Sequence, residues 1–166
     1  MKNRMISVML MAGLFFQMYS GAAFSSALAK MNILSLSAEP EAPEQAAVLS
    51  KILALKELQT FWPKNEDGTL KTICIQQYPT EFSARVTAAL ANREVQFCSR
   101  ESVVTSQPEA YIIFRYFAVE QGSARATVNF FYNCHAGKLN IASFTIDLKQ
   151  EGDNWSVTQI VNGGTR

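Results

Sequence analysis

The most constraining feature of this sequence is the stretch Tyr111–Val161, in which apolar and polar residues alternate in four successive segments. Alternation with a period of two is typical of strands that bury one face. A short turn containing a glycine separates each segment from the next, so consecutive strands are expected to pair as antiparallel hairpins. The pattern predicts a four-strand meander with strands at Tyr111–Val119, Ala124–Cys134, Leu139–Leu148 and Trp155–Val161.

The first strand of the meander is apolar at almost every position. A strand of this kind is expected to be covered on both faces, because neither side presents a polar surface to water. Uninterrupted alternation would place Ile112, Phe114 and Ala118 on one side and Tyr111, Ile113, Phe117 and Val119 on the other.

The first 29 residues have the layout of a secretory signal peptide. Lys2 and Arg4 form a positive start, Ile6–Phe16 is a largely apolar run, and Ala27–Ala29 matches an A-x-A cleavage pattern. Polar residues dilute the second half of the segment, whereas an anchor needs ~20 predominantly apolar residues to span a bilayer. Cleavage is therefore favoured over an uncleaved anchor, and the protein is expected to be exported, either periplasmic or secreted.

Cleavage would leave a flexible lead-in at residues 30–43 and a single α+β domain at residues 44–162, with Gly163 and Gly164 in a frayed tail. The removed segment holds two of the 15 basic residues and none of the 14 acidic ones, so the remainder has 13 basic residues and a net charge of −1. A chain so close to neutral lacks the basic surface that nucleic acid requires. No nucleic-acid partner is expected, and membrane contact is expected only if the N-terminal segment stays uncleaved.

Two helices and two strands are predicted upstream of the meander. Apolar residues at three- and four-residue spacing indicate a helix from Glu44 to about Trp62, which Pro63 ends. Leu70–Gln77 is a predicted strand, and Thr80 is a plausible N-cap of the second helix. Val95–Val104 begins as a strand and is expected to break near Ser99 and Arg100, at an edge or bulge with a local ion pair.

These elements predict an α+β fold: an antiparallel sheet of four to six strands, with two helices packed on one face and a signal peptide in front. Runs of strands and helices that do not alternate strictly are typical of this class.

Three cysteines remain after the signal segment, which in an oxidising compartment suggests one disulfide and one free thiol. Cys74 and Cys98 flank the second helix and would pair if their strands are neighbours. A Cys98–Cys134 bridge across the sheet is the alternative. The spacings fit no zinc pattern, so neither a metal site nor a cofactor is expected.

The C-terminal half resembles the closing hairpins of cystatin-like and NTF2-like domains. The resemblance rests on Ala124–Val128, on Phe144–Lys149 after a glycine turn, and on Gly152–Val157, and it covers roughly the last fifty residues. It implies a curled sheet that encloses a cone-shaped pocket, in which some enzymes of that superfamily use an aspartate as general base. No catalytic set of those enzymes matches here, so no catalytic residue is carried over.

Asp147 is the one carboxylate singled out for chemistry. It shares a strand face with Thr145 and Ser143, and in a curled sheet that face would line a pocket. A solvated face of an ordinary sheet is the simpler interpretation. The candidate binding residues on this face are Arg115, Asn129, Phe131 and Asp147, with Tyr116 nearby.

Nucleophilic catalysis by a cysteine is not favoured. Cys134 and His135 are adjacent, but neighbours on a strand point to opposite faces, and His135 is the single histidine. We therefore expect a non-catalytic module that binds a small ligand or an envelope protein. The alternatives are a small isomerase or hydratase with Asp147 as base, and a periplasmic inhibitor or assembly factor.

Overall fold

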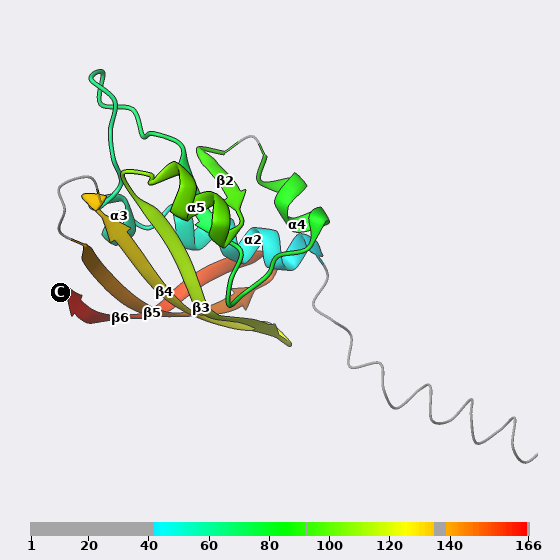
Figure 1. Cartoon of the computed structure of the whole chain (residues 1–166). Coiled ribbons are helices and arrows are strands. Elements are labelled where there is room, and N and C mark those ends of the chain that lie inside the picture. Colours follow the sequence, from blue (N-terminus) through cyan, green and yellow to red (C-terminus); the bar gives the residue numbers. More distant parts are fainter. Residues whose placement is uncertain (1–41, 92, 135–138, 166) are drawn as a thin grey trace, which may run out of the picture. The chain divides into compact units, whose positions relative to one another are not determined.

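The computed structural model describes residues 42–91, 93–134 and 139–165. The expected signal peptide, the lead-in up to residue 41 and the turn at His135–Lys138 lie outside these ranges. No helix within them is long and apolar enough to cross a membrane. The elements, in chain order (Figure 1), are α2 (Ala42–Leu53), α3 (Lys56–Gln59), β1 (Ile73–Gln76), α4 (Ala84–Ala89), β2 (Val95–Cys98), α5 (Arg100–Ser106), β3 (Tyr111–Glu120), β4 (Ser123–Tyr132), β5 (Asn140–Glu151) and β6 (Asn154–Thr165).

The strands form one six-stranded sheet in the order β2-β1-β3-β4-β5-β6. β3 to β6 pair antiparallel, which confirms the predicted meander. The expectation of a purely antiparallel sheet is wrong, however, because β1 pairs parallel with both β2 and β3. Each of these parallel steps contains a helix, and a parallel connection needs such a crossover to return the chain to the same end of the sheet.

The helices lie on both faces of the sheet, not on one as expected. Parallel crossovers are right-handed almost without exception. The crossover through α4 moves outward from β1 to β2, while the crossover through α5 returns from β2 past β1 to β3. Reversing the direction of travel at constant handedness moves the helix to the other face. Consequently α4 packs beside α2, and α5 packs over β1 on the opposite side (Figure 1).

A bulge in β3 changes the faces that uninterrupted alternation predicts. Phe114 is paired with Val128 and Tyr116 with Thr127, so Arg115 is an extra residue in the ladder. The alternation therefore shifts by one after Arg115. The expectation of two apolar faces holds only before the bulge, where Ile112 and Phe114 lie on one face and half-buried Tyr111 and Ile113 on the other. Beyond it Tyr116 is exposed, and the bulge puts Phe117 and Val119 on the side of Ile112 and Phe114.

The core lies between this side of the sheet and the helices α2, α3 and α4. Val48, Leu49 and Ile52 of α2 are fully buried, as the helical spacing predicts. The expected single helix to Trp62 is interrupted, because Leu55 is extended with ψ 130°. The freed Leu53 carbonyl accepts a hydrogen bond from the Gln59 side chain at 3.5 Å.

Two other local predictions differ from the structure. The second helix begins after Ser83, not Thr80, and the Ser83 hydroxyl accepts from Val86 N–H at 3.4 Å. The later start leaves Phe82 free to insert between the rings of Phe97, Phe114 and Phe117. The expected edge or bulge at Ser99–Ser102 is instead the first turn of α5, where the Ser99 hydroxyl caps Ser102 N–H at 3.1 Å.

The last strand is longer than expected. β6 continues through Gly163 and Gly164 to Thr165, so these glycines do not form a frayed tail. Thr165 is paired with Ala142 of β5. A Cβ on Gly163 would lie 3.2 Å from the Ser143 Cβ, which shows how closely the two strands approach there.

Candidate functional site

One face of the meander packs against α2, α3 and α4. We call the other face, which points away from these helices, the open face. Among the described residues, α5 covers this face at β1. At β4 and β5 the face is accessible to solvent. Four cross-strand pairs between β4 and β5 define it: Arg125–Asp147, Thr127–Thr145, Asn129–Ser143 and Phe131–Ile141.

The end of the open face nearest α5 is aromatic. Tyr111 and Phe131, which face each other across β3 and β4, stack with ring centroids 4.5 Å apart and planes within 2°. Phe131 is only 9% exposed. Burial raises the pKa of the Tyr111 hydroxyl, with a smaller contribution from nearby Cys134. Phe131 is therefore a packed side chain of this end and contributes little accessible surface.

The Cys134 thiol is free and half-buried in the same region. Burial raises its pKa, which reduces the fraction of reactive thiolate at neutral pH. The adjacent residue, His135, lies outside the described ranges. The chemistry at Cys134 is thus that of a shielded thiol.

The middle of the open face is uncharged and hydrogen-bonded. The Ser143 hydroxyl lies 3.0 Å from Asn129 Oδ1 and donates to it. Thr127 and Thr145 are paired beside them and are half-buried. This region offers hydroxyl and amide groups without a charge that would have to be neutralised on binding.

The far end of the open face carries an ion pair. Arg125 Nε donates to Asp147 Oδ1 at 2.6 Å, and Arg125 Nη2 donates to Asp147 Oδ2 at 3.0 Å. Two parallel hydrogen bonds orient both side chains. The Arg125 side chain is 62% exposed and that of Asp147 is 22% exposed, so the guanidinium shields the carboxylate from water.

An open depression of about 520 Å³ surrounds this pair. Tyr116 lies on one side of it, half exposed, and Lys149 and Thr158 lie on the other. Arg115 and Tyr116 both stand opposite Thr127 because of the bulge, and both are exposed. The bulge thus adds an extra polar or aromatic side chain to the strand next to the depression.

The environment of Asp147 does not favour a role as general base. The hydrogen bonds from Arg125 lower the pKa of the Asp147 carboxyl below its ordinary value, and the positive charge adds to the effect. A general base works best when its pKa is near the operating pH, which for a carboxylate requires a raised value. The shift at Asp147 is in the opposite direction.

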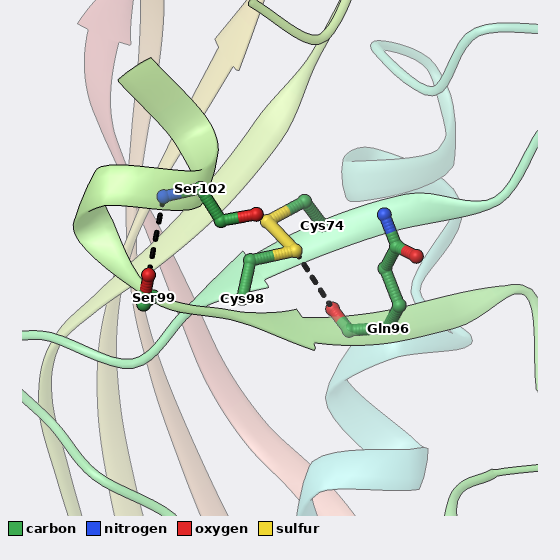
Figure 2. The surroundings of a disulfide bond; sticks show 5 residues. All are labelled: Cys74, Gln96, Cys98, Ser99 and Ser102. Carbon is green, nitrogen blue, oxygen red and sulfur yellow. Dashed lines mark hydrogen bonds between the residues drawn. A yellow bond between two sulfur atoms is a disulfide. The ribbon is translucent and has the colours of Figure 1, made fainter. Parts of the chain in front are cut away.

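The disulfide lies under α5. Cys74 and Cys98 are joined, with Cα atoms 5.9 Å apart, which is the pairing first expected from the sequence. Figure 2 shows the two sulfur atoms beside the first turn of α5, where Ser99 caps Ser102. The bridge holds β2 to β1 on the side of the sheet that α5 covers. The Cys98–Cys134 alternative is wrong, because Cys134 is free.

The structure brings Asn129, Phe131 and Asp147 onto one face, as the alternation predicts, with Arg115 at its border. Arg125, the direct partner of Asp147, is absent from the sequence-based set of candidates. A signal for it exists, because Arg125 precedes Thr127 by two residues and must share its face. Tyr111 is also absent, because the pairing of β3 with β4 decides which aromatic ring it meets.

Within residues 42–91, 93–134 and 139–165, no three His, Cys, Asp or Glu side chains gather where they could hold a metal ion. No family model and no curated protein matches the chain. Among solved structures, the NMR structure of a de novo designed beta-sheet protein is similar at a TM-score of 0.27, with 18% identity over 39% of this chain and 71% of that chain. A likeness at that level does not bear on fold or function.

Proposed function

We propose that this protein is an exported, non-catalytic module that binds another envelope protein through the open face. The observation that carries the proposal is the difference between the two sides of β3, β4 and β5. One side is sealed by helices, while the other presents a polar centre between an aromatic end and a charged end.

The chemistry of the open face fits a protein partner better than a small ligand. A small molecule is usually held in a pocket that buries most of its surface. The depression at Asp147 is open to solvent, and the charges of Arg125 and Asp147 in it are already paired with each other. Protein interfaces, in contrast, are broad, and tyrosine and arginine dominate their binding energy. Arg115, Tyr116 and Arg125 are exposed at this end.

Export is supported by two independent features. The N-terminal sequence has the order of a signal peptide, and Cys74 and Cys98 form a disulfide. Disulfides persist in oxidising compartments and are rare where thiols are kept reduced. Intact-mass measurement of the protein recovered from the envelope or medium should give a chain that starts at Lys30. A chain that starts at Met1 in the cytoplasm would contradict export.

Site-specific photo-crosslinking in the native host tests the binding face. A photoreactive phenylalanine at Tyr116 should form an adduct of defined mass with one envelope protein. Tyr78 is a matched control, because it is also an exposed tyrosine, at 56% against 50% for Tyr116, and it follows β1, outside the four cross-strand pairs that define the open face.

The captured protein is then purified and its affinity measured. Tyr116→Ala should weaken binding by about tenfold or more, as expected for an exposed tyrosine that becomes an anchor of an interface. Tyr78→Ala should bind like the natural chain. Equal affinity of Tyr116→Ala and the natural chain, or adducts at Tyr78 alone, would overturn the proposal.

A further inference from the structure

The two edges of the sheet are protected to different degrees. β2 has four residues, is flanked in sequence by Arg93, Glu94, Arg100 and Glu101, and is joined to β1 by the disulfide. β6 has twelve residues, and most of them are exposed. An exposed edge presents unpaired N–H and C=O groups that can pair with another strand.

β6 also lacks the residues that usually protect an edge. Lysine, other charges, proline and β-bulges are the common devices. β6 has two bulges, but it has neither charged residues nor proline. Each of β3, β4 and β5 contains at least one charged residue, although these strands are paired on both sides. Among the described residues, the charge is thus missing from the one long strand that is paired on a single side.

From this edge we infer that β6 pairs antiparallel with β6 of a second copy of the chain. A symmetric dimer places the same strand on both sides of its axis, so every charge near the axis would meet a like charge. A strand without charges avoids that repulsion. A different partner would gain rate and specificity from complementary charges on this edge, and β6 offers none. The absence of charge therefore favours a second copy.

The exposure of Val161 fixes the register. Two bulges interrupt the pairing of β5 with β6, one next to Leu148 and one between Ala142 and Phe144, and the regular segment between them is Gln159–Asn162. Val161 lies in this segment and is 47% exposed. Centring the axis on Val161 places it beside Val161 of the second copy, with Ile160 opposite Asn162 within the regular segment. Both exposed valines then become buried against each other.

The test is the association state of the protein purified in the form that is recovered from the envelope or medium. Sedimentation velocity from about 1 µM to about 500 µM should show a monomer that converts to a dimer by mass action. Val161→Lys puts two ammonium groups side by side at the axis and should weaken association by at least about tenfold. Val104→Lys is the control, because Val104 is 68% exposed on α5, away from β6. Circular dichroism establishes that both variants are folded.

A second measurement detects the dimer by cross-linking and does not depend on introducing a lysine at position 161. In a Cys134→Ser background, Val161→Cys should form a covalent dimer on oxidation, while Val104→Cys should stay monomeric. A natural chain that remains monomeric at every concentration overturns the inference. A dimer that Val161→Lys leaves intact, or that Val104→Lys dissociates equally, also overturns it. Tyr116→Ala should leave the dimer unchanged, because Tyr116 lies on β3, which two strands separate from β6.

Discussion

The two sides of the meander are made by alternate residues of the same strands, and they differ in every property that bears on function. On one side of β4, Ala124, Ala126 and Val128 are buried against helices. On the other side, Arg125 is exposed and Thr127 is half-buried. What differs is whether the side chains are committed to packing or remain available for a partner.

The bulge at Arg115 keeps the two sides distinct along β3. Without an extra residue, the pairs Ile112–Phe114 and Phe117–Val119 would face opposite ways, and half of them would be exposed. With the bulge, all four pack in the core and Tyr116 faces outward. A single inserted residue therefore supplies both core volume and an exposed aromatic side chain for the open face.

Single-residue deletions in β3 should give the largest difference between the two sides. Deleting Arg115 removes the bulge and leaves strict alternation with Phe114 and Phe117 still in the core. Deleting Ile113 preserves the register only by turning Phe114 outward and placing Arg115 in the core, because a one-residue slip exchanges the faces. We expect a folded chain that loses no more than about 2 kcal/mol in the first case and a loss above about 4 kcal/mol in the second.

The two deletion variants have equal length, so each is the control for the other. Denaturant titration followed by circular dichroism measures both free energies of unfolding. Equal destabilisation would show that the bulge is not the device that separates the two sides.

Side-chain truncation on the same strand should give the next largest difference. Phe114 is fully buried, with its ring centroid 5.4 Å from that of Phe82, and Phe114→Ala should cost about 3–5 kcal/mol through lost burial and a cavity. Tyr116→Ala, on the open face, should change the free energy of unfolding by no more than about 0.5 kcal/mol. Guanidinium titration provides both values. A large loss of unfolding free energy in Tyr116→Ala would mean that the ring stabilises the fold and is not simply available for binding.

The fate of these residues shows how far the sequence alone reaches. Period-two alternation predicts the meander, and its phase places Asn129, Phe131 and Asp147 on one face. The alternation does not predict the bulge, because β3 is apolar before and after Arg115. A strand with the bulge and a strand without it fit the pattern equally well. α5 is missed for a related reason: Val103 and Val104 read equally well as strand or helix, and the decisive signal is the capping hydroxyl of Ser99.

The strand topology can also be predicted only in part from the sequence. The alternation of strand and helix between Ile73 and Tyr111 already contains a parallel crossover, and its handedness then requires helices on both faces. That inference needs the strand order, which no local pattern encodes. The Cys74–Cys98 pairing was predicted because neighbouring strands place their residues within reach, and it agrees with the parallel pairing of β1 and β2.

Loss of the disulfide should have an intermediate effect, on the part of the open face that α5 covers. Cys74 and Cys98 are separated by 24 residues, and a bridge closing a loop of this size is worth ~3 kcal/mol. The double variant with serine at both positions should lose about that much, while Cys134→Ser should lose less than about 1 kcal/mol. Thiol titration of the unfolded, unreduced chain should find one thiol. Three titrating thiols would contradict the bridge.

The smallest expected effect concerns Asp147, and it decides whether the charged end of the open face is a preformed pair. The pKa of its carboxyl is lowered by the hydrogen bonds from Arg125, so the stabilisation from this pair is complete above the ordinary aspartate pKa near 3.9 and is lost as the pH falls through the lower folded-state value. In Arg125→Gln the Asp147 pKa should rise towards its ordinary value. Carboxyl carbon shifts followed by NMR from neutral to acidic pH measure it directly.

Asp67 is the internal control for this titration. Its pKa is also lowered, but by the hydroxyl and backbone of Thr69, so Arg125→Gln should leave it unchanged. If Asp147 titrates at its ordinary value in the natural chain, the pair is not formed in solution and both charges are free for a partner. The open face would then bind by supplying two separate charges, and Arg125→Gln would remove one of them without affecting the other. If instead the two titrations differ as expected, a partner meets a neutral, oriented pair, and Tyr116 is left as the main source of affinity at this end.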